Sequence, residues 1–97
     1  MQFMSPELRR KYEDNDKLTA INFEKNDVFA TGLVILAFYG IDIVGMNSHN
    51  GNWNGGLYSL EKLCDKKILK IVSEMLEFDP KRRIDFNSLE NLLNEDV

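Results

Sequence analysis

A strongly apolar segment at residues 28–39 constrains the fold of this chain more than any other feature. It follows Asn26 and Asp27, which suit a helix start, and it ends before Gly40, which suits a C-terminal helix cap. Its apolar residues occur at nearly every position, a pattern typical of a helix buried on every side. The segment is too short to span a bilayer. We therefore expect a central helix buried inside a larger core.

A short helix is predicted near the start of the chain. Ser5 can cap it, Pro6 suits its first position, and Glu7 places an acid in its first turn. Residues 9–16 are almost entirely charged or polar and have no apolar repeat that would bury a face. We expect these residues to form a solvated turn or loop.

Three more helices are predicted after the central one. Residues 57–64 suit a short helix, and Asp65 can cap a longer one that runs to about residue 78. That longer helix has the strongest amphipathic pattern of the chain, with Ile68, Leu69, Ile71, Val72, Met75 and Leu76 on one face. Asp79 and Pro80 should end it, and Asp85 should cap a last helix through residue 93.

No segment alternates as a half-buried strand does. The expected fold class is therefore mainly α, with about five helices around one buried central helix and no substantial sheet. Residues 45–56 hold four Gly and four Asn and are expected to form a flexible surface loop. A phosphate-binding loop is disfavoured there, because no Lys-Ser/Thr ending, G-x-G spacing or preceding strand accompanies the glycines.

Composition excludes several classes of function. The 97 residues allow one small domain or part of a larger one, so residues 1–97 are treated as one unit. The chain has 12 Lys and Arg against 16 Asp and Glu, spread along its length, which does not favour binding to nucleic acid or an anionic membrane. The first residues lack the pattern of a secretory signal, so a cytoplasmic location is expected. Cys64 and His49 are too few for a metal site or a thiol nucleophile.

Three separated motifs, in this order, resemble the large lobe of serine/threonine protein kinases from the end of the activation segment onward. Residues 2–7, Gln-Phe-Met-Ser-Pro-Glu, are similar to the variant of Ala-Pro-Glu that closes that segment. Residues 26–32 are similar to the start of the family's central buried helix, with Phe29 for Trp and Ala30 for Ser. Residues 75–83 resemble the family's Leu, Asp-Pro and Arg pattern. The resemblance covers almost the whole chain.

The resemblance implies roles for several residues. In the family, the Arg at the place of Arg83 pairs with the Glu at the place of Glu7, so a partly buried ion pair is expected to fasten the first helix to the last two. Asp27 would organise a catalytic loop that this sequence does not contain. Without the resemblance, Asp27 is a helix-start acid, and Arg82 and Arg83 are a solvated charge run or cations favoured by a helix dipole. The other motif residues are Ser5, Pro6, Gly32, Asp79 and Pro80.

Phosphoryl transfer by kinases needs a Gly-rich loop, a Lys held by a Glu, a catalytic Asp, and an Asn and Asp for magnesium. None of these motifs occurs in this sequence. We expect no catalytic, cofactor-binding or metal-binding residue and no kinase activity from this chain alone; ATP and Mg are implied only for an intact parent that phosphorylates Ser or Thr. The alternative is a non-catalytic kinase-like interaction module. Expected partners are a protein substrate, a regulator or the missing kinase half.

Overall fold

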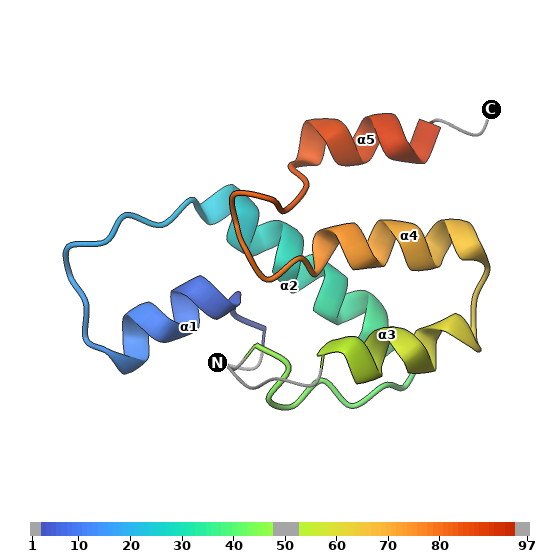
Figure 1. Ribbon diagram of the computed structural model, residues 1–97, viewed down its shortest axis with the longest axis horizontal. Helices are drawn as coiled ribbons and strands as arrows, with labels where there is room; N and C mark the ends of the chain where they lie inside the picture. Colours follow the sequence, from blue (N-terminus) through green and yellow to red (C-terminus); the bar gives the residue numbers. More distant parts are fainter. Residues whose placement is uncertain (1–2, 48–52, 95–97) are drawn as a thin grey trace.

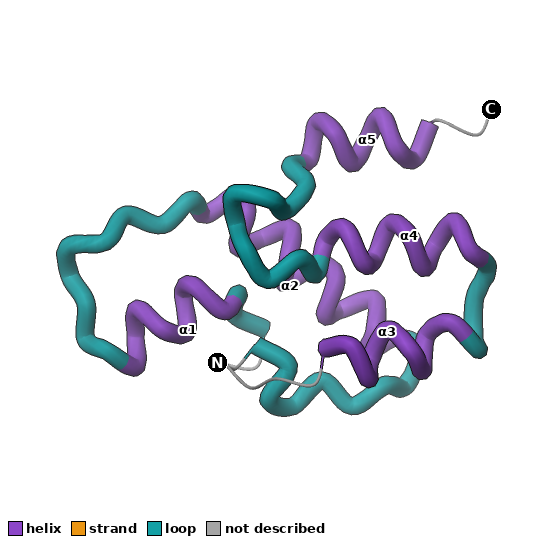
Figure 2. The backbone as a smooth tube through the Cα atoms, in the orientation of Figure 1, coloured by secondary structure: helices purple, strands orange, loops and turns teal. Residues whose placement is uncertain are grey.

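Five helices make up the secondary structure of residues 3–47 and 53–94, the part of the chain that the computed structural model describes (Figure 1). They are α1 (Pro6–Glu13), α2 (Phe23–Phe38), α3 (Trp53–Glu61), α4 (Lys66–Met75) and α5 (Phe86–Asn94). Within those residues the chain forms no strand, and Figure 2 shows only helices joined by loops. The prediction of a small, mainly α fold is confirmed.

Three of the predicted helix caps are present. The Ser5 hydroxyl accepts from the Leu8 N–H at 3.4 Å, Asp65 accepts from the Ile68 N–H at 3.0 Å, and Asp85 accepts from the Ser88 N–H at 2.7 Å. Each cap satisfies a backbone donor that the first turn of a helix leaves without a partner. These short polar side chains therefore fix where α1, α4 and α5 begin.

The prediction of a loop over residues 9–16 is wrong for its first half, because α1 continues to Glu13. Arg9 pairs with Glu13 at 3.3 Å across one helical turn. Arg, Lys and Glu are also good helix formers, so α1 forms without the apolar repeat that would bury a face. Only Pro6 of α1 is buried.

Helix α2 starts four residues earlier than the sequence indicates. Its N-cap is Asn22, whose side chain accepts from the Lys25 N–H at 3.2 Å. Asn26, the predicted cap, lies inside the helix and accepts from the Ser5 N–H at 2.8 Å. A second possible cap one turn upstream explains the error, because both asparagines precede the apolar run.

The end of α2 agrees with the predicted role of Gly40. Tyr39 is the C-cap, and Gly40 follows it with φ of +80°, a conformation that glycine adopts without strain. The Gly40 N–H donates to Ala37 and the Ile41 N–H donates to Leu36. This pair of hydrogen bonds is a Schellman motif and reverses the chain toward α3.

Two other boundaries also differ from expectation. Helix α3 begins at Trp53, inside the predicted loop of residues 45–56, and ends at Glu61 instead of residue 64. Gly56 lies so close to Met46 that a Cβ there would be 2.6 Å from the methionine Cε, so this glycine allows α3 to pack closely against Met46. Residues 48–52, including His49, lie outside the described part of the chain.

Helix α4 packs against three of the other four helices. It contacts α2, α3 and α5, and it ends at Met75, three residues before the predicted end. Gly32 lets α2 approach the end of α4 closely: a Cβ there would lie 2.9 Å from Leu76 Cδ2 and 3.2 Å from Met75 Cβ. The main core cluster contains Phe29, Leu33, Leu36, Ile43, Met46, Leu60, Val72 and Leu76. The predicted apolar face of α4 therefore supplies much of the core.

A helix at the centre of a larger core would be buried on every side, whereas α2 within this chain is partly exposed. The principal dimensions of the molecule are 43 × 27 × 17 Å. Two packed helix layers need roughly 15 Å between their outermost Cα atoms and three need more than about 20 Å, so the thickness accommodates two layers. In Figure 1, which looks along this short axis, α4 and α2 cross. Helix α2 consequently has helical cover on one side, and Val34 and Phe38 are 53% and 86% exposed.

Candidate functional site around Glu7 and Arg83

A turn between α4 and α5 directs Arg83 into the interior. The Lys81 N–H donates to the Asp79 carboxylate at 3.0 Å, and the N–H groups of Arg82 and Arg83 donate to the Asp79 carbonyl, both at 3.0 Å. Pro80 lies within the turn and cannot continue a helix. Asp79 and Pro80 thus fold the backbone so that two adjacent arginines take opposite directions: the Arg82 side chain is 76% exposed and the Arg83 side chain is fully buried.

Glu7 and Arg83 form the predicted ion pair. The Arg83 Nη1 lies 2.6 Å from Glu7 Oε2, and Nη2 lies 2.9 Å from Oε1. Two parallel hydrogen bonds between a guanidinium and a carboxylate are the strong, directional form of such a contact. The Glu7 side chain is 16% exposed, so the pair is shielded from water on the arginine side and touches it on the other. For Arg83, the interpretation as a solvated charge is therefore wrong.

The remaining donors of Arg83 reach backbone carbonyls. The side chain donates to Glu77 at 2.7 Å, to Lys25 at 2.9 Å and to Phe78 at 3.0 Å. Its guanidinium carbon also lies 4.9 Å from the centre of the Phe29 ring, the residue at the place of the family's Trp. Arg83 consequently joins α1, α2 and the end of α4 through one side chain.

Lys25 strengthens the same junction from α2. Its ammonium donates to the carbonyl of Arg83, while its own carbonyl accepts from the Arg83 guanidinium. The two residues therefore exchange hydrogen bonds, although 58 positions separate them in the chain. Sequence patterns gave no indication of this contact.

The start of α1 has a second polar anchor that sequence reasoning missed. Asn47 is 2% exposed; its amide donates to the Met4 carbonyl at 2.8 Å, and its oxygen accepts from Arg9 at 2.6 Å. Ser5 is fully buried, with its N–H bound to Asn26. These bonds satisfy polar groups whose burial would otherwise be costly. Asn47 belongs to the segment interpreted from its composition as a surface loop.

The other residues singled out by the kinase resemblance lie in different surroundings. Pro6 is buried at the start of α1, and Gly32 lies in the contact between α2 and α4. Asp27 is exposed in the second turn of α2, and its carboxylate makes no hydrogen bond or ion pair with the residues the structure describes. The structure thus brings Glu7 and Arg83 together and leaves Asp27 away from their contact.

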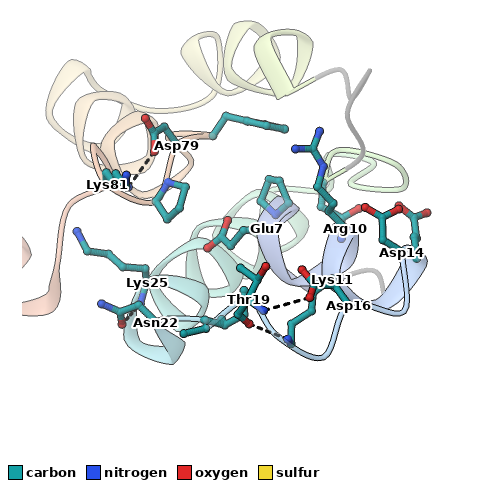
Figure 3. A pocket seen from close by; sticks show the side chains of 17 residues that line it. Glu7, Arg10, Lys11, Asp14, Asp16, Thr19, Asn22, Lys25, Asp79 and Lys81 are labelled. Atoms are coloured by element: carbon teal, nitrogen blue, oxygen red, sulfur yellow. Dashed lines mark hydrogen bonds between the residues drawn. The ribbon is translucent and has the colours of Figure 1, made fainter.

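A groove of about 800 Å³ lies beside the ion pair, bordered by α1, the α1–α2 connection, the start of α2 and residues 78–81. Figure 3 shows Glu7 between α1 and the turn that carries Asp79 and Lys81. The charged side chains at its border, besides Glu7, are of both signs: Arg10, Lys11, Lys25 and Lys81 are basic, and Glu13, Asp14, Asp16 and Asp79 are acidic. The groove therefore lacks the concentrated positive charge and the Gly-rich backbone that bind a nucleoside triphosphate. The groove residues therefore do not fit ATP with magnesium.

Two groups with shifted pKa values bear on the possible chemistry: Asp16 lines the groove, and Cys64 does not. The side-chain hydroxyl of Thr19 and the N–H groups of Leu18 and Thr19 lower the pKa of Asp16 from 3.8 to about 2. Burial, with a smaller contribution from Asp65, raises the pKa of the Cys64 thiol, which is the opposite of what a thiolate nucleophile requires. The Cys64 Sγ lies 3.3 Å from the Leu60 carbonyl within the core. Cys64 thus behaves as a small core residue.

Neither a cluster of metal-ligating side chains nor a helix that could span a membrane is found in the described part of the chain. Residues 3–47 and 53–94 contain no group of three or more His, Cys, Asp or Glu side chains that could hold a metal ion. No helix among those residues is long and apolar enough to cross a membrane.

Comparison of the chain with protein-family models, with curated proteins and with solved structures finds no match. A functional assignment therefore has to come from the motifs of the sequence and the contacts of these residues. Among them, the buried ion pair between Glu7 and Arg83 is the arrangement with the most specific geometry.

Proposed function

We propose that this chain is the closing part of the large lobe of a serine/threonine protein kinase domain. The observation that carries the proposal is the bidentate Glu7–Arg83 pair, because it joins the first and the last of the three kinase-like motifs across 76 positions of sequence. Arg82, the adjacent residue of the same type, is exposed and lies 3.9 Å from Glu77. Selection of one arginine, whose side chain is fully buried, for the bidentate pair supports a specific structural role for the motif.

The intact parent would transfer the γ-phosphate of ATP to Ser or Thr of protein substrates, with magnesium as the metal. Binding of ATP and magnesium would depend on motifs that this sequence does not contain, since the groove beside Glu7 does not fit them. This chain would instead hold the end of the activation segment in place: Arg83 binds Glu7 and so fixes the start of α1 against α2. Alone, the chain would have no kinase activity.

Reading the coding sequence upstream of Met1 tests this proposal most directly. We expect an open frame that encodes a catalytic Asp loop and an Asp-Phe-Gly motif. An in-frame stop directly upstream, with no such motifs, would instead make this chain a separate module and overturn the proposal. In a parent protein, Arg83→Met should reduce phosphorylation of a peptide substrate because α1 loses its anchor, whereas Arg82→Met should leave it unchanged.

A second candidate is a non-catalytic kinase-like module that binds a protein regulator or substrate in the cytoplasm. The observation that favours it is the exposed apolar surface of α2 and α5, where Phe38, Phe86 and Leu93 are 86%, 42% and 52% exposed. Surfaces of this kind usually mark contacts with another protein. The chain's thermal behaviour distinguishes the two candidates: a severed lobe should be oligomeric or unfold over a broad range, whereas an independent module should unfold cooperatively as a monomer.

A further inference from the structure

The groove beside the Glu7–Arg83 pair has apolar residues in its lining. These are Pro6, which is buried, and Ile21, Phe78 and Pro80, which stay partly accessible. They come from α1, the α1–α2 connection and the turn after α4, and we call them the groove floor. The groove volume of about 800 Å³ falls in the range of pockets that hold ligands. Every lining residue belongs to the described part of this chain, so the groove needs no other chain to form.

The charges around the groove floor differ between its two sides. Besides Glu7, which is paired with Arg83, the side formed by α1 and the α1–α2 connection carries three acids and two bases. The side formed by α2 and residues 78–81 carries two lysines and one acid. The first side therefore has a net charge of −1 and the second a net charge of +1. An occupant that carries charges of both signs suits such a groove better than one with a single sign.

Most of the charged side chains at the border already interact within the chain. This group consists of Arg10, Lys11, Glu13, Asp16, Lys25 and Asp79. Asp14 and Lys81 differ from them: both are exposed, and neither side chain makes a hydrogen bond or ion pair with a described residue. One carboxylate on the negative side and one ammonium on the positive side are thus available to a ligand.

The distance between these two groups sets the size of the ligand. Figure 3 shows Glu7 between Asp14 on one side and Lys81 on the other. Glu7 lies in α1 and Asp14 is its C-cap, and their separation in sequence corresponds to about 10 Å along the helix. A free amino acid is too short to reach both ends. An extended peptide rises about 3.3 Å per residue, so three or four of its residues cover this length.

We propose that this groove binds an extended segment of a partner protein with a basic residue at one end, apolar residues in the middle and an acidic residue at the other end. The basic residue pairs with Asp14, the apolar residues cover the groove floor, and the acidic residue pairs with Lys81. A nucleic acid is disfavoured, because its phosphates would meet the negative side of the groove. The inference uses only residues of this chain and does not depend on the kinase assignment.

The probe is a fluorescently labelled peptide, Arg-Leu-Pro-Leu-Glu, in which proline favours an extended backbone. The control peptide has glutamate in place of the arginine. Titration of each peptide with the full chain, followed by fluorescence anisotropy, should show about fivefold tighter binding of the arginine peptide. Asp14→Lys should reverse the order of the two peptides. Glu90→Lys should leave the order unchanged, because Glu90 is exposed on α5, outside the groove. Equal affinities, or no binding of either peptide, would overturn the proposal.

Two substitutions in the α1–α2 connection locate the contact. Ile21→Ser should weaken binding of the arginine peptide by about tenfold, because it removes an apolar residue of the groove floor. Leu18→Ser is the matched control: Leu18 is 96% exposed and does not line the groove, so binding should not change. Circular dichroism should show the same helix content for both variants. If the two substitutions weaken binding equally, or if Asp14→Lys leaves the preference between the peptides as it was, the peptide binds elsewhere and the proposal is wrong.

Discussion

The attachment of α1 and the packing of α2 against α4 show two different ways of holding a helix. Helix α1 buries only Pro6 and is held by polar contacts from Arg83, Asn26 and Asn47. The α2–α4 contact is apolar and is shared by many side chains of the main core cluster. A polar attachment concentrates its free energy in a few groups, whereas an apolar one distributes it over area. Single substitutions should therefore affect the two regions very differently.

Arg83→Met should have the largest effect. It removes both bonds to Glu7 and the bonds to three carbonyls, and it leaves a mostly buried carboxylate without its cation. Loss of one partner of a buried ion pair costs about 3–5 kcal/mol, with the lower end expected here because Glu7 retains some contact with water. Hydrogen exchange read by mass spectrometry should show α1 losing protection to a greater extent than α4.

Arg82→Met provides a matched control, since it makes the same substitution at the adjacent residue. Arg82 is exposed and its 3.9 Å contact with Glu77 is that of a surface pair. Surface pairs contribute about 0–1 kcal/mol, so α1 exchange should remain as in the unsubstituted chain. Equal deprotection by the two substitutions would show that the arginines act through net charge and that the buried pair does not anchor α1.

Gly32→Ala should have the next largest effect and tests the apolar contact. The added Cβ would meet Leu76 and the Cβ of Met75, and neither the backbone of α2 nor that of α4 can move without disturbing the core. Overpacking of this kind costs about 1–3 kcal/mol, offset in part by the helix propensity of alanine, worth about 1 kcal/mol. Urea unfolding followed by circular dichroism should give a lower midpoint.

Gly56→Ala is the corresponding control in α3. Its added Cβ would meet the terminal Cε of Met46, which can rotate away because methionine has a long, unbranched side chain. The gain in helix propensity should then offset the contact, and the urea midpoint should stay nearly constant or rise. A larger loss at Gly56 than at Gly32 would contradict the expectation that Met46 yields to an added Cβ more readily than Leu76 and Met75 do.

Much of the fold was predictable because its signals are local. Ser5, Asp65 and Asp85 each mark a helix start by a short polar side chain, and the 3.6-residue repeat of α4 gives its buried face correctly. The sequence does not reveal which sides of α2 are covered by other helices. The same apolar residues occur in a helix surrounded by neighbours and in one that carries a second, exposed face. Only the spatial arrangement distinguishes these cases.

The candidate site likewise has some contacts that were predicted from the sequence and others that were missed. The Glu7–Arg83 pair was predicted from the resemblance to kinases, since neither residue has a local pattern that identifies the other. Asn47 and Lys25 were missed because hydrogen bonds between residues far apart in sequence have no periodicity. The start of α2 was misplaced because Asn22 and Asn26 are equally good caps, and the contact between Asn26 and Ser5 decides between them. Polar anchors between distant segments are thus the part that sequence patterns reveal least.

Acid should have the smallest effect, and it should act on the polar region more than on the apolar one. Thr19 and Leu18 lower the pKa of Asp16 from 3.8 to about 2. The ionised carboxylate therefore stabilises the fold at pH values above the ordinary Asp pKa of 3.8, and this contribution is lost as the pH falls through about 2. Asp16→Asn should abolish that dependence. The measurement is an NMR titration of the Asp16 carboxyl, together with the amide signals of Leu18 and Thr19. A midpoint near 3.8 would show that the α1–α2 connection does not hold Asp16 in this turn.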